Sequence, residues 1–405
     1  MIAFLRRISA RRLLALCAAV VAIGAGGTAL ALAATGGGPT PPPKDLPVAI
    51  HDALTAPKVE GVTARIQFTN HLINNSDVQG GSPLLNGASG RLWASSDGHV
   101  RLELQADASS EGATSDAQVL SDGHQVTVYD SGTNTVYKAD LPPERQDSAG
   151  NQDEQPPSVA QIEKDLSRLT EHATVSGAQP SDVAGQPAYT VRVEPKQNGG
   201  LVGGAELAWD AVHGAPLRAA VYAKGDSSPV VELTATDISY GPVSSSVFDV
   251  HPPADAKVTD LTPKGSGGSE TQGGQASADQ APVTGLEQVQ QAVGFPIAAP
   301  DSLAGMPRSE VRLIHSGDHP GALVTYGQGL AGIAVIEHPA DSKDGSGTGG
   351  DQGQISLPKV SINGVQGDEL ETPLGTLINF QRSGVDYTVV GSVVPATALA
   401  AAQGL

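Results

Sequence analysis

Alternating apolar and polar residues, interrupted by turn residues, run from about residue 62 to residue 240 and constrain the fold more than any other feature. In residues 62–72 (VTARIQFTNHL), Ile66 and Phe68 share one face of an extended chain, and polar residues occupy the other. The same period of two returns in residues 100–105 (VRLELQ). Because successive side chains of a strand point to opposite faces, these runs predict half-buried strands. Turn dipeptides between the runs indicate hairpins, so we expect an antiparallel sheet with one apolar face.

Two amphipathic segments are expected to form helices that lie on this apolar face. Residues 46–56 (LPVAIHDALTA) repeat a leucine or isoleucine every fourth residue, as on one side of a short helix. In residues 158–172, Ser158 and Gln161 have the spacing of a capping box. The apolar stripe of this second helix consists of Val159, Ile162, Leu166 and Leu169.

The first 34 residues direct the chain to a membrane. Four arginines precede an uninterrupted apolar run from Leu13 to Ala34, which is the composition of an export segment. Small residues near Ala33 suit cleavage as a signal peptide, whereas a run of about 20 apolar residues is also long enough for a membrane anchor. Both alternatives stay open. Positively charged residues beside an apolar segment tend to stay in the cytoplasm. Both alternatives therefore place the chain after residue 35 outside the cytoplasm, either secreted or anchored to the cell membrane.

Low-complexity segments divide the remaining chain. The Gly/Pro-rich residues 35–45 are expected to act as a tether, and the alternating strands with their two helices occupy residues 46–262. Residues 263–282 contain almost no apolar residue larger than alanine and predict a linker. Residues 283–405 begin with a helix for which Thr284 is the expected cap, and continue with strand-like runs and a terminal helix. They predict a small α+β domain.

Composition and motifs argue against several classes of function. The net charge of −19 repels phosphate backbones, so we expect no nucleic-acid partner. Cys17 is the single cysteine, which excludes a disulfide framework or a cysteine-ligated metal in the exported part. Residues 327–332 match the G-x-G-x-x-G pattern, but a strand-like run follows where a dinucleotide site needs a helix, so we expect a hairpin loop. The sequence therefore predicts a protein that is not an enzyme and that holds neither cofactor nor metal.

Three motifs follow one another in a distinctive order: GRLWASSDGHVRLEL, SDGHQVTVYDSGTNTVYKADLP and SSSVFDVHPPADAKV. In this order they resemble the LolA/RseB superfamily, over about residues 46–260. The residues that carry the resemblance are Trp93, Arg101, Asp122, Gly123, Tyr129, Asp130, Tyr137, Phe248 and Pro253. The resemblance implies an α+β fold: an unclosed antiparallel β half-barrel with helices on its concave face, followed here by a small domain of unknown function.

The resemblance also implies a binding protein outside the cytoplasm that holds a lipid, or the acyl chain of a lipoprotein, on the concave apolar face. The expected cavity wall consists of Ile66, Phe68, Trp93, Leu102 and Leu104, and the expected lid of Ile162, Leu166 and Leu169. Two alternatives stand beside this hypothesis. One is a regulatory module, as in RseB, that binds a membrane anti-sigma factor or another envelope protein. The other is an apolar face that is simply a filled core without a ligand.

Overall fold

The computed structural model describes residues 38–73, 83, 87–106, 116–141, 156–196, 200–260, 283–316, 319–340 and 357–405. They belong to two compact units, the first ending at residue 261 and the second beginning at residue 262. The predicted export segment (residues 1–34) and linker (residues 263–282) lie outside the described residues. Among the helices that the structure describes, none is both long and apolar enough to cross a membrane.

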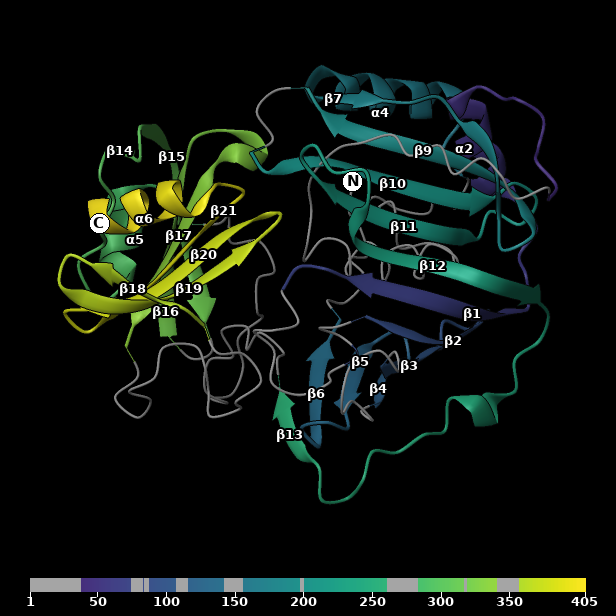
Figure 1. The fold of residues 1–405 in the computed structure, drawn as a ribbon, viewed down its shortest axis with the longest axis horizontal. Coiled ribbons are helices and arrows are strands. Elements are labelled where there is room, and N and C mark those ends of the chain that lie inside the picture. Colours follow the sequence, from purple (N-terminus) through teal and green to yellow (C-terminus); the bar gives the residue numbers. More distant parts are fainter. Residues whose placement is uncertain are drawn as a thin grey trace, which may run out of the picture. The chain divides into compact units, whose positions relative to one another are not determined.

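The first unit is built on one large open sheet, whose strands turn progressively from β9 to β6 (Figure 1). In sequence order its strands are β1 (Gly61–Asn70), β2 (Ala88–Ser95), β3 (Val100–Ala106), β4 (Asp116–Ser121), β5 (Gln125–Asp130), β6 (Thr135–Asp140), β7 (Ala173–Val175), β8 (Gln179–Val183), β9 (Gln186–Pro195), β10 (Val202–Asp210), β11 (Pro216–Ala223), β12 (Pro229–Tyr240) and β13 (Lys257–Asp260). Across the sheet the order is β13-β6-β5-β4-β3-β2-β1-β12-β11-β10-β9-β7, with β8 also paired to β9. The two ends of this order, β13 and β7, are separate edges, so the sheet is unclosed.

Strand register explains why one face of this sheet is apolar. Directly opposite residues of an antiparallel pair share a face. One row of such residues crosses six neighbouring strands, from β9 through β10, β11, β12 and β1 to β2, and we call it the apolar row. Its members are Val191, Leu207, Ala219, Leu233, Phe68 and Ala88. The alternation seen in the sequence therefore becomes a continuous apolar surface only because these strands pair in register.

Helices α2 (Leu46–Thr55) and α4 (Val159–His172) cover one part of the apolar face. At the start of α4, Ser158 Oγ accepts a hydrogen bond from the Gln161 N–H at 3.3 Å, as the sequence predicts. The Gln161 side chain bonds to Asp165 instead of returning to the cap, so only half of the capping box forms. Both helices pack on β9 and β10, in a buried cluster that consists of Leu46, Ala49, Ala178, Tyr189 and Trp209.

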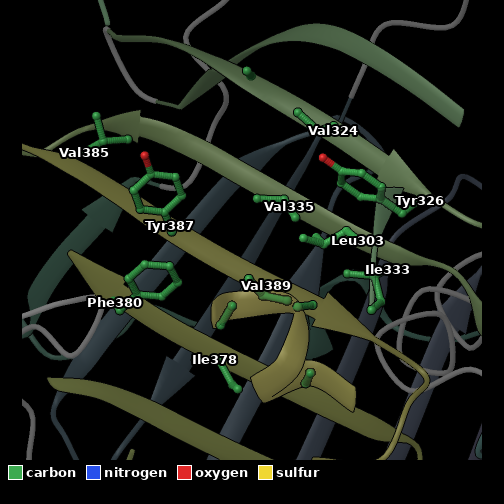
Figure 2. Packing of buried hydrophobic residues seen from close by; sticks show 14 of the residues in the cluster. Leu303, Val324, Tyr326, Ile333, Val335, Ile378, Phe380, Val385, Tyr387 and Val389 are labelled. Carbon is green, nitrogen blue, oxygen red and sulfur yellow. The ribbon is translucent and has the colours of Figure 1, made fainter. Parts of the chain in front are cut away.

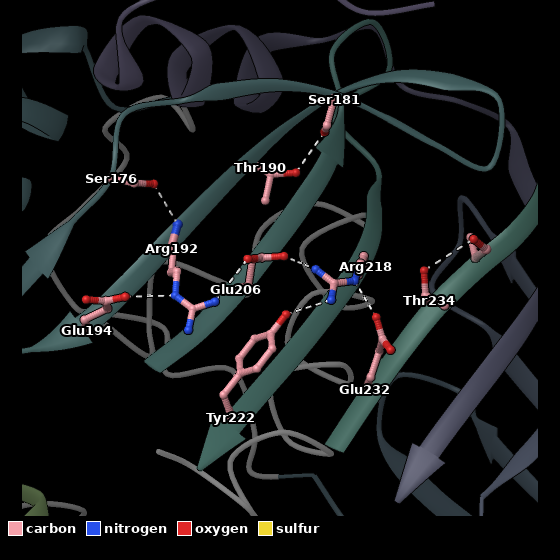
Figure 3. Close-up of polar contacts among 11 residues, drawn as sticks. Ser176, Ser181, Thr190, Arg192, Glu194, Glu206, Arg218, Tyr222, Glu232 and Thr234 are labelled. Carbon is pink, nitrogen blue, oxygen red and sulfur yellow. Dashed lines mark hydrogen bonds and ion pairs between the residues drawn. The ribbon is translucent and has the colours of Figure 1, made fainter. Parts of the chain in front are cut away.

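The opposite face of β9 to β12 carries a row of alternating charges, which we call the charge ladder (Figure 3). Its members, in order across the strands, are Glu194, Arg192, Glu206, Arg218 and Glu232. Arg192 Nε lies 2.9 Å from Glu194 Oε1, and Arg192 Nη1 lies 3.4 Å from Glu206 Oε2. Arg218 pairs with both Glu206 and Glu232. Since each inner member has an opposite charge on either side, the ladder ties four strands together.

The second unit contains an eight-stranded antiparallel sheet in the order β14-β15-β16-β17-β21-β20-β19-β18. Its strands are β14 (Ser302–Leu303), β15 (Met306–Ser316), β16 (His319–Tyr326), β17 (Ile333–Pro339), β18 (Lys359–Ile362), β19 (Val365–Thr372), β20 (Gly375–Arg382) and β21 (Val385–Gly391). Helices α5 (Leu286–Ala292) and α6 (Pro395–Gly404) pack against it. Figure 2 shows the core, where Val335, Ile378 and Val389 lie on one face of the sheet. Three alanines of α6 complete this core, because their small side chains let the helix approach closely.

The predicted fold class is confirmed: the protein is α+β, with an open β half-barrel, covering helices and a second α+β unit. Two details of the prediction are wrong. The first sheet is not wholly antiparallel, because β13 runs parallel to β6. Thr284 does not cap a helix, since it forms a β-bridge with Arg312 and Gly285 occupies the N-cap of α5. Residues 327–332 join the antiparallel strands β16 and β17, which confirms the predicted hairpin connection.

Candidate functional site

Four of the five predicted cavity-wall residues lie together on the apolar face of β1 and β3. Ile66, Phe68, Leu102 and Leu104 are all buried, with exposed fractions between 2% and 6%. Ile66 and Leu104 both lie opposite Gly90, from the two strands that flank it. A side chain at Gly90 would meet the carbonyl oxygen of the neighbouring strand, so glycine lets the strands approach closely at this point.

Trp93 is the exception, and its assignment to the cavity wall is wrong. It lies opposite Thr63 on β1 and Arg101 on β3, on the polar face of the sheet. The Arg101 guanidinium carbon lies 5.4 Å from the centre of the Trp93 ring, a cation–π contact. Because side chains alternate along a strand, the adjacent Leu92 is the residue that joins the apolar face, with Leu102 opposite it.

The predicted lid residues lie on another part of the same face. Ile162 is buried, Leu166 packs at the margin of the cluster beneath α2 and α4, and Leu169 is partly buried. That cluster contains none of the four wall residues. The residues expected to form the lid therefore lie over β9 and β10, and the apolar row runs from there to the expected wall residue Phe68 on β1.

The apolar face is closely packed in this conformation. A cavity of about 30 Å³ lies over β1, β2, β11 and β12, and its lining includes Ile66, Leu92, Leu217 and Leu233. This space is enough for a water molecule, whereas sites for small molecules begin at about 300 Å³. A ligand could enter this face only if part of its cover moved.

Tyr240, Asp210 and His213 lie together at the end of β10, and their hydrogen bonds hold a turn. The buried carboxylate of Asp210 accepts hydrogen bonds from the Val212 N–H (2.7 Å), the His213 N–H (2.9 Å) and the Tyr240 hydroxyl (2.6 Å). Burial acts to raise the pKa of Asp210, but these hydrogen bonds outweigh it and lower the pKa. The turn that they hold ends at Gly214, where a side chain would collide with the Ala53 carbonyl of α2. The group therefore fastens a turn that supports α2.

The second unit holds a buried acid that sequence reasoning missed. Glu337 is fully buried on β17, where its Oε2 accepts a hydrogen bond from the Ala298 N–H at 2.9 Å. Within the described residues, its Oε1 has no hydrogen-bond partner. Burial raises the pKa of Glu337 to about 7, against the opposing effects of the Ala298 hydrogen bond and the Arg382 charge. The alternation of buried residues along β17 predicts that Glu337 faces the core, because it follows the buried Val335 by two residues.

Comparisons with known proteins give matches among solved structures only. No protein-family model matches the chain, and no curated protein sequence matches it. A crystal structure of MucB in complex with MucA(peri) is 16% identical, with a TM-score of 0.39, over 88% of this chain and 96% of that chain. A putative outer membrane lipoprotein-sorting protein domain from Vibrio parahaemolyticus is 10% identical, with a TM-score of 0.22, over 50% of this chain and 94% of that chain.

A third similar structure is a LolA superfamily protein from Nitrosomonas europaea. It is 10% identical, with a TM-score of 0.21, over 51% of this chain and 98% of that chain.

Proposed function

We propose that the protein is a non-enzymatic binding protein that works outside the cytoplasm, brought there by residues 1–34, and that its apolar face takes up the acyl chain of a lipid or lipoprotein. The apolar row carries this proposal, because it runs without interruption from beneath α2 and α4 to the wall residue Phe68. Six strands about 4.8 Å apart span about 24 Å. One leaflet of a bilayer contributes about half of a hydrocarbon core about 30 Å thick, so the row is long enough for an acyl chain.

The lid is held by few buried side chains, which favours its opening. Of the 14 residues of α4, Ile162 is the one that is buried, and most of the others are exposed. Each methylene group that an acyl chain buries contributes about 0.8 kcal/mol. Uncovering Ile162, Leu166 and Leu169 costs about 3 kcal/mol at most for each side chain, so a chain that buries a dozen or more methylene groups can offset this cost.

Replacing Leu166 by alanine is expected to increase the affinity for a fluorescent long-chain fatty acid about tenfold. The substitution removes packing between the lid and β9, so less free energy is spent on opening. Titration of the full chain with the fatty acid, followed by fluorescence, measures the change. Arg168→Ala is the matched control, because the Arg168 side chain is 65% exposed on the same helix.

Leu233→Glu tests whether the acyl chain lies on the apolar row, because it puts a charge in the middle of this row. Uptake should be abolished, because a buried carboxylate has no partner there. A chain that takes up no fatty acid, with or without Leu166→Ala, would contradict the proposal. Capture of an anti-sigma-factor ectodomain that Leu233→Glu leaves unchanged would instead favour the regulatory module that the sequence resemblance raises as the alternative.

A further inference from the structure

A second cavity lies on the opposite, outer face of the first unit's sheet. Its volume is about 380 Å³, within the range of small-molecule sites. The floor is formed by β4, β5 and β6, where Leu120, Thr127 and Lys138 lie opposite one another in turn. The roof is the connection between β12 and β13, residues 247–256, which we call the strap. We call the cavity between strap and sheet the slot.

Both ends of the strap are fastened to the sheet. At the first end, Arg101 Nη1 donates a hydrogen bond to the Val247 carbonyl at 2.7 Å. The Phe248 ring beside it lies 5.5 Å from the His99 ring. At the other end, Asn134 Nδ2 donates to Asp255 Oδ2 at 3.1 Å, and the Lys257 N–H donates to the Asn134 carbonyl at 2.9 Å. The strap is therefore a fixed bridge across the outer face.

The middle of the strap is prevented from joining the sheet. Pro252 and Pro253 line the slot, and neither has a backbone N–H to donate to a neighbouring strand. With its ends held and its centre unable to pair, the strap stands off from β5 and β6 and leaves the slot open. The slot is thus formed before any ligand arrives, which lowers the entropic cost of binding.

Among the described residues, the lining of the slot combines an apolar surface with one lysine whose ammonium group is unpaired. Leu120, Val136, Phe248, Val250 and Val258 supply the apolar part. Lys138 lines the slot, and within the described residues its ammonium group has no hydrogen-bond or ion-pair partner. The acid in the lining, Asp122, is engaged in its own turn, where Oδ1 accepts from the N–H groups of Gln125 (2.7 Å) and His124 (2.8 Å). His251 lies at the rim, with its side chain 84% exposed.

We propose that the slot is a binding site for a single-chain anionic amphiphile, with the anionic head on Lys138 and the chain between Phe248, Val250 and the sheet. At about 30 Å³ per water-sized group, the slot holds about a dozen heavy atoms, which corresponds to a medium-length chain such as that of decanoate. A fatty carboxylate and an alkyl phosphate share this chemistry. The site is separate from the apolar row, which lies on the other face of the sheet, and it does not depend on the lid.

Calorimetric titration of the full chain with decanoate, decyl phosphate and uncharged decanol tests the proposal. Lys138→Gln should weaken decanoate binding about tenfold and remove the preference for decanoate over decanol, because the charge-assisted hydrogen bond is lost. Val250→Trp should abolish binding of all three by filling the slot from the strap. The matched control is Lys257→Gln, since Lys257 is exposed next to the strap and does not line the slot.

The result separates this site from the acyl-chain site of the proposed function. Leu233→Glu on the apolar face should leave decanoate binding unchanged in the folded protein, and a cooperative unfolding transition above the titration temperature shows that each variant is folded. Stronger binding of decyl phosphate than of decanoate assigns a phosphate head, and the reverse order a carboxylate. Absence of decanoate binding, or binding that neither Lys138→Gln nor Val250→Trp changes, overturns the proposal, as does binding that Leu233→Glu abolishes.

Discussion

Replacing Arg218 by methionine is expected to destabilise the first unit by about 3 kcal/mol. The Arg218 side chain is only 20% exposed, and it pairs with Glu206 and Glu232, which are 11% and 18% exposed. Methionine fills similar space but leaves two mostly buried carboxylates without that partner, and an uncompensated charge away from water is costly. Urea unfolding, followed through the transition of the first unit, measures the loss.

Two further variants separate the loss of charge pairing from the loss of packing. Adding Glu206→Gln and Glu232→Gln to Arg218→Met should recover much of the stability, because the triple variant leaves no unpaired charge at these positions. Arg168→Met is the surface control: its partner Asp165 lies 3.5 Å away on an exposed helix face, so the change should be below about 1 kcal/mol. Equal effects of Arg218→Met and Arg168→Met would show that the charge ladder contributes little.

Glu337→Gln is expected to stabilise the second unit at pH 8 by about 3 kcal/mol and to flatten its pH dependence. The folded state raises the pKa of Glu337 from 4.5 to about 7, so the native protein binds this proton more tightly than the unfolded chain. The associated stability is fully present below pH 4.5 and is lost as the pH rises through about 7. Glutamine cannot ionise, and its amide oxygen keeps the hydrogen bond from the Ala298 N–H.

Thermal unfolding between pH 4 and pH 9 measures this difference. Glu371→Gln is the control, because Glu371 lies at an exposed position of the same sheet and its replacement removes no buried charge. If Glu337→Gln and the unchanged protein lost stability in parallel above pH 5, the buried acid would not be the source of the pH dependence.

The sequence predicts the faces of the strands well, and its errors have identifiable causes. Alternation places Ile66, Phe68, Leu102 and Leu104 on one face, where the structure has them. Trp93 does not follow this alternation, which assigns the apolar face of β2 to the adjacent Leu92. The position of a residue along its strand therefore predicts its face correctly here, and its large apolar side chain does not.

Features that depend on distant segments are beyond local patterns. The parallel pairing of β13 with β6 joins residues more than a hundred positions apart. β13 has only four residues and no apolar run, so no sequence pattern predicts it as a strand. The slot depends on Arg101 and Asn134 holding a strap that comes much later in the chain. The position of Glu337 follows from alternation, but its raised pKa follows from burial, which only tertiary packing determines.

Both sheets end in their shortest strands, and this protects the protein from aggregation. The edges of the first sheet are β13 with four residues and, beside β9, β7 with three and β8 with five; those of the second are β14 with two and β18 with four. An exposed edge offers unpaired backbone groups to another chain, and a long edge is a template for intermolecular β-sheet growth. Such short edge strands offer few unpaired backbone groups to a neighbouring copy of the protein. Two of these strands, β13 and β18, also begin with a lysine. A chain this rich in strands can therefore remain dispersed at high local concentration.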